Sequence, residues 1–163
     1  MSPKVTVIIP CYNSEKFVAE CVLSAVTQTY ENIEVIAVDN ESTDNTMAIL
    51  QAMAEHHDNL IISSAKNIYP NCWDEAREEG YRLMTGDYVT VIGSDDLIEK
   101  DYVKNCIEII QKSKGTIRAF QSIAMGFKDH PRGKVRTGLI EYRYENREQF
   151  MSQSLQRCVV NSP

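Results

Sequence analysis

The stretch that decides the fold is VTVIIPCYNSEKFVAECVLSAVTQTYENIEVIAVDNESTDNT, residues 5–46. It opens with a continuous apolar, β-branched run from Val5 to Ile9, and a similar run extends from Ile33 to Val38. Such runs are typical of strands buried on both faces of a sheet. Between them, Ser14 is a suitable N-cap for a helix over residues 15–29. Two buried strands joined by a helix predict a parallel βαβ unit.

The same alternation continues along the chain. We expect further elements in this order: a helix that begins after residues 42–46, a short strand over 60–63, a helix over 72–85, a buried strand over 88–92 and a helix over 101–113. Residues 117–127 and 134–142 form two extended segments around a turn at 130–133, and a last helix is expected over 146–157. This order predicts an α/β fold with a mostly parallel central sheet and flanking helices.

The composition limits the classes of function. The chain has 163 residues, 43% of them hydrophobic and 25% charged, and a net charge of −6. This acidic balance without a Lys/Arg cluster argues against nucleic-acid binding, which depends on neutralising phosphates. The five cysteines form no CxxC pair, which favours a reducing compartment where they serve as small core residues.

The ends of the chain bear on its location. No segment approaches the roughly 20 apolar residues of a membrane span, and no signal peptide opens the sequence. We therefore expect a cytoplasmic protein, with peripheral association at the inner face of the membrane as a further option. The chain stops at residues 159–163 without a polar tail or a helix cap, so we expect a piece of a longer protein.

Polar residues follow three of the expected strands, at residues 10–13, 39–42 and 93–96. In an open α/β sheet, ligands bind beyond the carboxyl ends of the strands, so these three segments are expected to converge on one site. They supply an aromatic ring, several acids and small polar groups.

The motifs that are missing narrow the ligand. No GxGxxG follows the first strand, which argues against a dinucleotide-binding domain, and no P-loop sequence occurs. An acidic site can hold a diphosphate only through a bridging cation, and carboxylates suit Mg²⁺ or Mn²⁺. The predicted ligand is a metal-chelated nucleotide diphosphate.

Three strings resemble the family 2 glycosyltransferases of the GT-A fold: residues 5–46 quoted above, AREEG at 76–80 and GDYVTVIGSDD at 86–96. The resemblance covers residues 4–110. It implies a GT-A, Rossmann-like sheet in a single domain over residues 1–163, apparently truncated at its C-terminus. Donor-binding βα units would occupy residues 1–113, and an incomplete acceptor-side part would begin at 114–163.

The resemblance assigns the donor base to the first two segments. Pro10 and Tyr12 match the motif whose aromatic ring lies against uracil, and Asn13 follows them. Asp39 matches the acid that accepts the uracil N3–H, and Asn40 follows it. A carboxylate only accepts hydrogen bonds, and uracil, unlike cytosine, presents a donor there.

The resemblance assigns the diphosphate and the cation to the remaining matching residues. Arg77 corresponds to an arginine near the pyrimidine and the diphosphate. Ser94 completes the donor-binding set, and Asp95 matches the acid that holds Mn²⁺ or Mg²⁺, with Asp96 as a second metal ligand. The cation would stabilise the leaving nucleotide diphosphate.

The chain departs from the family pattern at four positions. Asn40 replaces the second acid of a usual pair, Glu41 a usual glycine, Glu78 a usual asparagine, and Gly93 the first acid of the D-S-D-D signature. The loss at Gly93 predicts weaker donor or metal binding, unless Asp96, Asp39 or a water compensates.

The catalytic base is a further gap. Family members invert the sugar and use a carboxylate base. Glu141, Glu145 and Glu148 lie in a charged segment typical of a solvated face, so we expect the base beyond Pro163.

These features predict transfer of a sugar from a UDP-sugar to a saccharide or lipid-linked acceptor, in polysaccharide or glycoconjugate synthesis. A non-catalytic nucleotide-sugar-binding module and a phospho-acceptor signalling domain are the alternatives. The latter is disfavoured because the first strand ends in Pro10-Cys11-Tyr12 rather than in an acid pair. Structural readings also stand for single residues: Asp39 as a helix cap, Asp95 and Asp96 as N-terminal helix charges, Arg77 as a surface ion-pair residue, and Tyr12 and Trp73 as packing residues.

Overall fold

The computed structural model describes residues 2–68 and 72–112, and beyond these only four short strands. The chain divides into two compact units, Met1–Asn105 and Cys106–Pro163. The elements are, in order, β1 (Val5–Cys11), α1 (Val18–Val26), β2 (Ile33–Asp39), α2 (Thr46–Ala54), β3 (Leu60–Ser64), α3 (Cys72–Leu83), β4 (Tyr88–Val91), α4 (Tyr102–Lys112), β5 (Ala119–Gln121), β6 (Phe127–Lys128), β7 (His130–Pro131) and β8 (Ile140–Tyr142).

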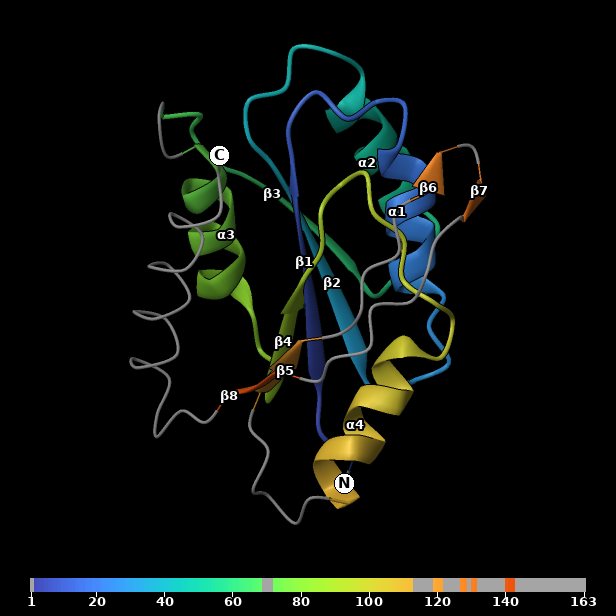
Figure 1. Cartoon of the computed structure of the whole chain (residues 1–163). Coiled ribbons are helices and arrows are strands. Elements are labelled where there is room, and N and C mark those ends of the chain that lie inside the picture. Colours follow the sequence, from blue (N-terminus) through green and yellow to red (C-terminus); the bar gives the residue numbers. More distant parts are fainter. Residues whose placement is uncertain are drawn as a thin grey trace. The chain divides into compact units, whose positions relative to one another are not determined.

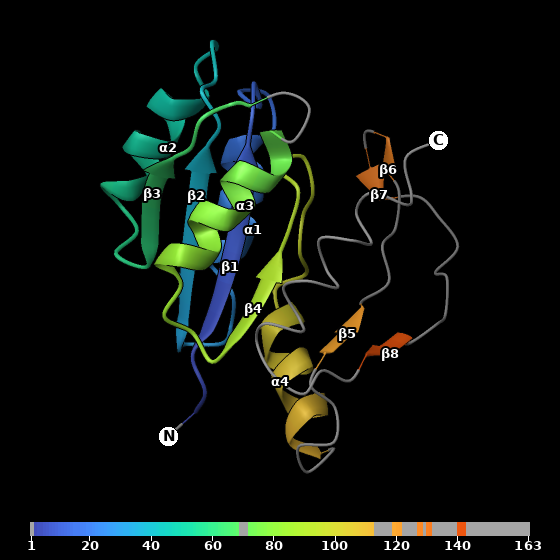
Figure 2. The same cartoon turned by 90° about the vertical axis from the view of Figure 1, so that its left-hand side faces the viewer.

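The first unit is built on a four-stranded parallel sheet in the order β3-β2-β1-β4. The crossover helices α1 and α2 lie on one face of this sheet and α3 lies on the other (Figures 1 and 2). Every residue of β1 and of β2 is buried, as their apolar runs predict. The predicted α/β fold with a parallel central sheet is confirmed.

The register places the ends of the two central strands side by side. β1 pairs with β2 from Val5↔Ile33 to Cys11↔Asp39, so both strands end at the same level. The segments that follow them therefore begin next to each other at the carboxyl edge of the sheet, which lies at the top of Figure 1.

Two details of β1 and β4 differ from expectation. We expected Pro10 to end the first strand, but β1 continues to Cys11 with Pro10 paired to Val38. The pairing of β1 with β4 ends at Ile8↔Val91. Pro10 lies beyond this pair, so its missing N–H leaves no paired residue of β4 without a hydrogen-bond donor. Strand β4 was expected to be buried but is half-buried, because it is the edge strand of this sheet.

Helix α1 begins at Val18, later than expected, and the predicted Ser14 cap is wrong. Phe17 occupies the N-cap position without a side-chain cap hydrogen bond. The Ser14 carbonyl accepts from the Phe17 and Val18 amides, at 2.9 Å each. The Ser14 hydroxyl is engaged elsewhere, as the site shows below.

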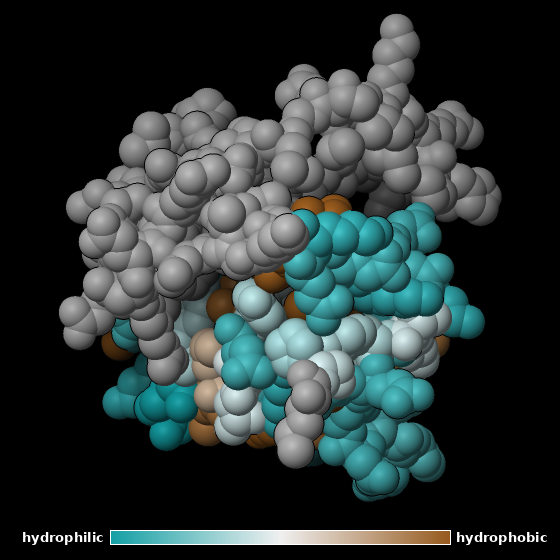
Figure 3. Space-filling view, turned by 90° about the horizontal axis from the view of Figure 1, so that it is seen from below, coloured by the Kyte–Doolittle hydropathy of each residue, from teal (hydrophilic) through white to brown (hydrophobic). Residues whose placement is uncertain are grey.

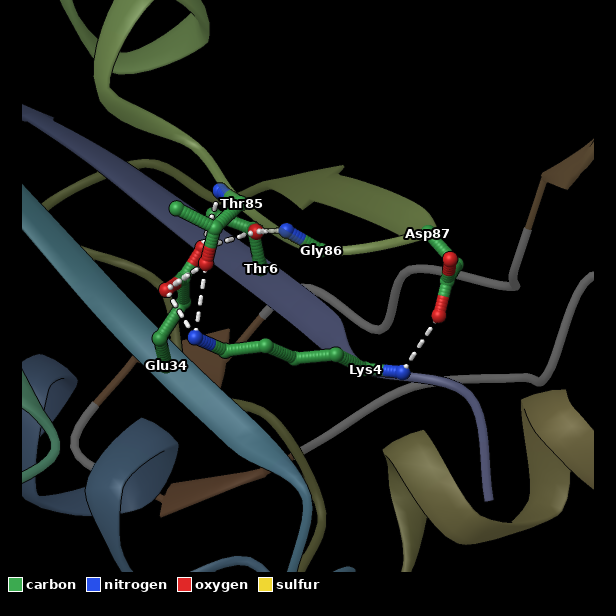
Figure 4. Close-up of polar contacts among 6 residues, drawn as sticks. All are labelled: Lys4, Thr6, Glu34, Thr85, Gly86 and Asp87. Atoms are coloured by element: carbon green, nitrogen blue, oxygen red, sulfur yellow. Dashed lines mark hydrogen bonds and ion pairs between the residues drawn. The ribbon is translucent and has the colours of Figure 1, made fainter. Parts of the chain in front are cut away.

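A buried carboxylate ties the strands together at the opposite, amino edge of the sheet. Glu34 Oε1 accepts from Thr6 Oγ1 and from the Thr85 amide at 2.6 Å, and Glu34 Oε2 pairs with Lys4 Nζ at 2.6 Å (Figure 4). Burial alone would raise the pKa of Glu34, but these hydrogen bonds outweigh it and lower the pKa to about 2. Glu34, the charged residue within the second apolar run, is thus a clamp that links β1, β2 and the segment before β4. Both of its carboxylate oxygens have partners.

The surface at this edge carries no large apolar area among its described side chains. Seen from below, these are mostly hydrophilic or neutral, with small hydrophobic areas between them (Figure 3). In the described part of the chain, no helix is both long and apolar enough to cross a bilayer.

The described strands of the second unit form two antiparallel pairs. β5 pairs with β8, as expected of two extended segments around a turn. His130 and Pro131 were expected in that turn, but they form β7, which pairs with β6 through Lys128↔His130. The helix predicted over 146–157 lies outside the described residues.

Candidate functional site

The first two polar segments meet at the ends of β1 and β2. The Asn40 amide donates to the Cys11 carbonyl at 2.8 Å, which extends the strand pairing by one step. The Asp39 carbonyl accepts from the Ala65 amide at 2.9 Å, so the segment after β3 joins them. The predicted convergence at the carboxyl edge is present.

Asn13 fastens these two segments to each other. Its amide donates to Ser42 Oγ at 2.9 Å, and its Oδ1 accepts from the Thr43 amide at 2.8 Å. Its backbone is in the left-handed region, with φ of 47°, which asparagine tolerates better than most residues. Asn13 shapes the site; its contact with a donor stays a prediction.

Glu41 has the same backbone geometry, with φ of 58°. This conformation favours glycine, which is the residue that the resemblance gives for this position. The Glu41 side chain contributes a contact that glycine lacks, because its Oε2 accepts from the Asn67 amide at 3.0 Å. Glu41 therefore ties the segment after β2 to the segment that leads toward α3.

Asp39 is the unusual group of the site. Its side chain is only 4% exposed, and its Oδ2 accepts from the Ser42 amide at 3.1 Å. Its Oδ1 is buried and has no hydrogen-bond partner among the described residues. A buried carboxylate oxygen without a donor is costly, so this position is suited to a donor that arrives with a ligand. A role limited to capping a helix does not account for Oδ1.

The other members of the first two segments differ in exposure. Pro10 and Asn40 are buried, whereas the Tyr12 ring is 47% exposed at the sheet edge. This exposure does not fit the reading of Tyr12 as a packing residue. Tyr12 follows Cys11, which pairs with Asp39, so both residues lie at the same edge of the sheet.

The third segment is joined to the first through two buried hydroxyls. Ser14 Oγ donates to the Tyr12 carbonyl at 3.1 Å and lies 2.6 Å from Ser94 Oγ. A hydroxyl has one hydrogen, and a carbonyl only accepts, so Ser94 must donate to Ser14. The Ser94 oxygen is left with acceptor capacity only, which suits a ligand hydroxyl or a bound water.

Cys21 supports the same segment from α1. Its thiol donates to the Gly93 carbonyl at 3.2 Å. Burial, with added repulsion from Asp96 and Asp95, raises the pKa of Cys21 to about 12, so it stays a thiol. Cys21 and Cys11 are both fully buried, which confirms the prediction of core cysteines for this pair.

Asp95 and Asp96 are exposed and converge over Gly93. A Cβ placed on Gly93 would lie 2.9 Å from Asp95 Oδ1 and 2.9 Å from Asp96 Oδ2. The two carboxylates thus occupy the space that a side chain at position 93 would take. The Gly93 backbone itself is not left-handed, so it does not require glycine.

This pair fits a divalent cation that is shared with a diphosphate. Within the described residues, no group of three or more His, Cys, Asp or Glu side chains is placed to hold a metal alone. Mg²⁺ and similar ions are often held by one or two carboxylates together with substrate phosphates. The donor set of Asp95 and Asp96 is of that kind.

Helix α3 carries Arg77 beside the sheet. Its neighbour Ala76 is fully buried in a cluster with Ile36 and Val38. The Arg77 guanidinium pairs with Asp74, as the structural alternative expected, but the Arg77 side chain is only 12% exposed. Helix α3 itself packs on β1 and β2 (Figure 2).

Two residues near the site were not assigned to it from sequence. Ser14 joins two of its segments, and the signal for Ser14 was there but was interpreted as a helix cap. Trp73 was expected to pack, but it is 53% exposed in the first turn of α3.

Known proteins with similar sequences decide the family. The model of glycosyl transferase family 2 matches residues 6–159. The chain belongs to glycosyl transferase family 2. The glycosyltransferase GlyA of Streptococcus pneumoniae is 37% identical over 70% of the chain, and the chondroitin synthase of Escherichia coli is 36% identical over 68%. The family 2 chain spans 16% of the length of each of these relatives.

Solved structures agree with this family and fold. S. aureus TarS in complex with UDP-GlcNAc matches with a TM-score of 0.58 and 30% identity, over 67% of this chain and 31% of that one. A mannosyltransferase from Pyrobaculum calidifontis, in complex with GDP-Man and Mn²⁺, matches with a TM-score of 0.62 and 28% identity, over 72% of this chain and 34% of that one. The family 2 chain therefore has the GT-A fold that its strings implied.

Proposed function

We propose that this chain is the donor-binding part of an inverting glycosyltransferase that uses a UDP-sugar. The observation that carries the proposal is the buried Asp39 Oδ1, which lacks a hydrogen-bond donor among the described residues. Asp39 and Tyr12, which is 47% exposed, lie at the ends of the paired strands β1 and β2. Uracil supplies both missing partners, a face for the ring and an N3–H for the carboxylate.

The comparisons support a nucleotide-sugar donor but do not decide which nucleobase it carries. TarS is described in complex with UDP-GlcNAc, and the archaeal relative in complex with GDP-Man. In this chain, the Ser42 amide donates to Asp39 Oδ2, and Oδ1 has no donor among the described residues. An acceptor without a donor suits the N3–H of uracil, so UDP is the proposed nucleotide.

The cation belongs to the same proposal. Asp95 and Asp96 would hold Mn²⁺ or Mg²⁺ jointly with the diphosphate, and when bound the ion stabilises the charge of the leaving nucleotide diphosphate. The chain's own contribution is to orient these groups: Cys21 holds the Gly93 carbonyl, and Ser14 holds Ser94. Arg77 supplies a fixed positive charge near the diphosphate.

The acceptor is proposed to be a hydroxyl of a saccharide or of a lipid-linked saccharide, in polysaccharide or glycoconjugate synthesis. The similarity to a chondroitin synthase supports this class. We place the reaction in the cytoplasm, at the inner face of the membrane when the acceptor is lipid-linked. The base that removes the acceptor proton is not among the residues assigned here.

Calorimetry tests the donor site. UDP is titrated with and without Mn²⁺ into the wild type, Asp39→Ala and Asp95→Ala. We expect Mn²⁺-dependent UDP binding by the wild type, a loss in both states for Asp39→Ala, and loss of the Mn²⁺ dependence alone for Asp95→Ala. Absence of UDP binding by the wild type would contradict the proposed donor site.

Gly93 favours one second candidate, a nucleotide-sugar-binding module without turnover. In this reading the missing acid leaves a site that binds the donor but does not activate it. Release of UDP by the complete gene product, supplied with donor and acceptor, supports the transferase. Donor binding without release supports the module.

A further inference from the structure

Helix α3 presents Trp73 toward the end of β1. Residues seven apart on a helix point in nearly the same direction, about 20° from each other. Trp73 and Gly80 are such a pair. A Cβ on Gly80 would lie 2.4 Å from Ile8 Cγ2, so this direction from the helix axis leads straight onto the central strand.

The exposure of Trp73 follows from where the strand ends. Seven helical residues advance about 10 Å, which corresponds to about three strand residues. Helix α3 runs back from the carboxyl edge of the sheet (Figure 2). From these rises we infer that Trp73 lies about three strand residues beyond Ile8, near the level of Cys11. Helical side chains also lean toward the start of their helix, here away from the sheet. Ala76 is fully buried one turn farther in, whereas Trp73 is 53% exposed, which agrees with a side chain beyond the strand end.

Two exposed aromatic side chains therefore border the same strand end from different elements. Tyr12 is the residue after β1 and is 47% exposed, and Trp73 approaches from α3. Exposing a tryptophan to this extent forgoes much of the gain from burying its large apolar surface. Aromatic side chains that flank an open space are suited to a flat heteroaromatic ring.

We propose that Trp73 is a second wall of the base site, so that the nucleobase of the donor lies between the rings of Tyr12 and Trp73. This inference rests on the proposed function and extends it to a binding residue outside the matched strings. It also gives the long side chain at the start of α3 a reason to remain uncovered in the free protein.

Trp73 is the chain's sole tryptophan, so its fluorescence reports on its own surroundings. The emission is followed during titration with UMP, UDP and UDP-glucose, and with inorganic pyrophosphate as a ligand without a base. We expect UMP and UDP to change the emission as fully as UDP-glucose does, and pyrophosphate to leave it unchanged. A change with UDP-glucose alone would assign Trp73 to the sugar and overturn the proposal.

Calorimetry on variants gives the second measurement. Trp73→Ala is expected to weaken UDP binding roughly 10-fold, and Trp73→Phe to retain most of the affinity. The matched control is Phe17→Ala, which removes a 54% exposed ring at the start of α1, on the other face of the sheet. Its UDP affinity is expected to stay at the wild-type value.

The outcomes separate this inference from the function beneath it. One outcome is that UDP binds the wild type and Trp73→Ala equally well without changing the emission. That outcome would show that Trp73 is not a wall of the base site, while the proposed donor site would remain supported. If UDP binds neither protein, both proposals fail.

Discussion

The hydroxyl oxygens of Ser14 and Ser94 lie 2.6 Å apart, although 80 residues separate them in the sequence. Through its amide, Ser14 also donates to Thr46 Oγ1 at 2.8 Å. One small residue thus contacts the segments after β2 and β4 as well as its own. Because Ser94 immediately precedes Asp95, we expect this contact to help position the Asp95 carboxylate.

Removing the Ser14 hydroxyl is predicted to weaken cation binding more than binding of the nucleobase. In Ser14→Ala the Ser94 hydroxyl loses its buried acceptor, which costs about 1–3 kcal/mol unless the segment shifts. We expect the segment to shift and the Mn²⁺-dependent gain in UDP affinity to shrink several-fold, while UDP binding without Mn²⁺ changes little. Calorimetry with and without Mn²⁺ measures both quantities.

The control for Ser14→Ala is Ser63→Ala, which removes a half-buried hydroxyl on β3 that donates to Glu79 Oε1. It is expected to leave the Mn²⁺ effect intact. An equal loss of UDP affinity in the presence and absence of Mn²⁺ for Ser14→Ala would contradict the role given to this contact.

The Glu34 clamp predicts a specific dependence of stability on pH. Because the folded pKa is lowered from 4.5 to about 2, the clamp stabilises the protein fully above the unfolded pKa. This stabilisation, about 3 kcal/mol, is lost as the pH falls from about 4.5 toward 2. Glu34→Gln is expected to lower the free energy of unfolding at pH 7 by a similar amount, and to lose less stability on acidification. Urea unfolding at pH 7 and pH 3 measures it.

Glu31→Gln is the matched control, because Glu31 is an exposed acid three residues earlier. Its unfolding free energy is expected to follow the wild type at both pH values. A deficit of Glu34→Gln that is as large at pH 3 as at pH 7 would show that Glu34 does not act through its charge.

Asp39→Asn is predicted to weaken UDP binding and to raise the thermal stability of the free protein. The amide keeps an acceptor for the Ser42 N–H but presents an NH₂ group where Oδ1 was. UDP binding should fall at least about 10-fold, and CDP binding should rise, because cytosine offers an acceptor at N3. The midpoint of thermal unfolding, Tm, should rise without ligand, because a buried negative charge with one unpaired oxygen is replaced by a neutral amide.

Calorimetry with UDP and CDP, together with thermal unfolding, tests both halves of this prediction. The conservative reference is Asp58→Asn, at an exposed acid before β3. Equal losses of UDP and CDP affinity would indicate that Asp39 supports the fold of the segment rather than reading the base.

The four parallel strands were predictable because their apolar runs are strong local signals. The polar segments beyond them followed from the rule that ligands bind at the carboxyl edge. What the sequence could not show depends on distant neighbours. The strand continues through Pro10 because β4 ends at Val91, and the Ser14 hydroxyl contacts Ser94 instead of capping α1. The exposure of Trp73, which we infer to follow from the level at which β1 ends relative to α3, also depends on such neighbours.

The altered metal motif gives the last prediction. In Gly93→Asp the new Cβ crowds the Asp95 and Asp96 carboxylates, whose ends are free to turn aside. A third negative charge beside two others is unfavourable until a cation binds. We therefore expect Gly93→Asp to have a lower Tm than the wild type without metal, and to gain more from Mn²⁺. Gly93→Asn brings the same bulk without the charge, and it should show the crowding but not the larger Mn²⁺ response. Thermal unfolding of the three proteins across a Mn²⁺ series separates these effects, and equal responses of Gly93→Asp and Gly93→Asn would show that position 93 does not face the cation.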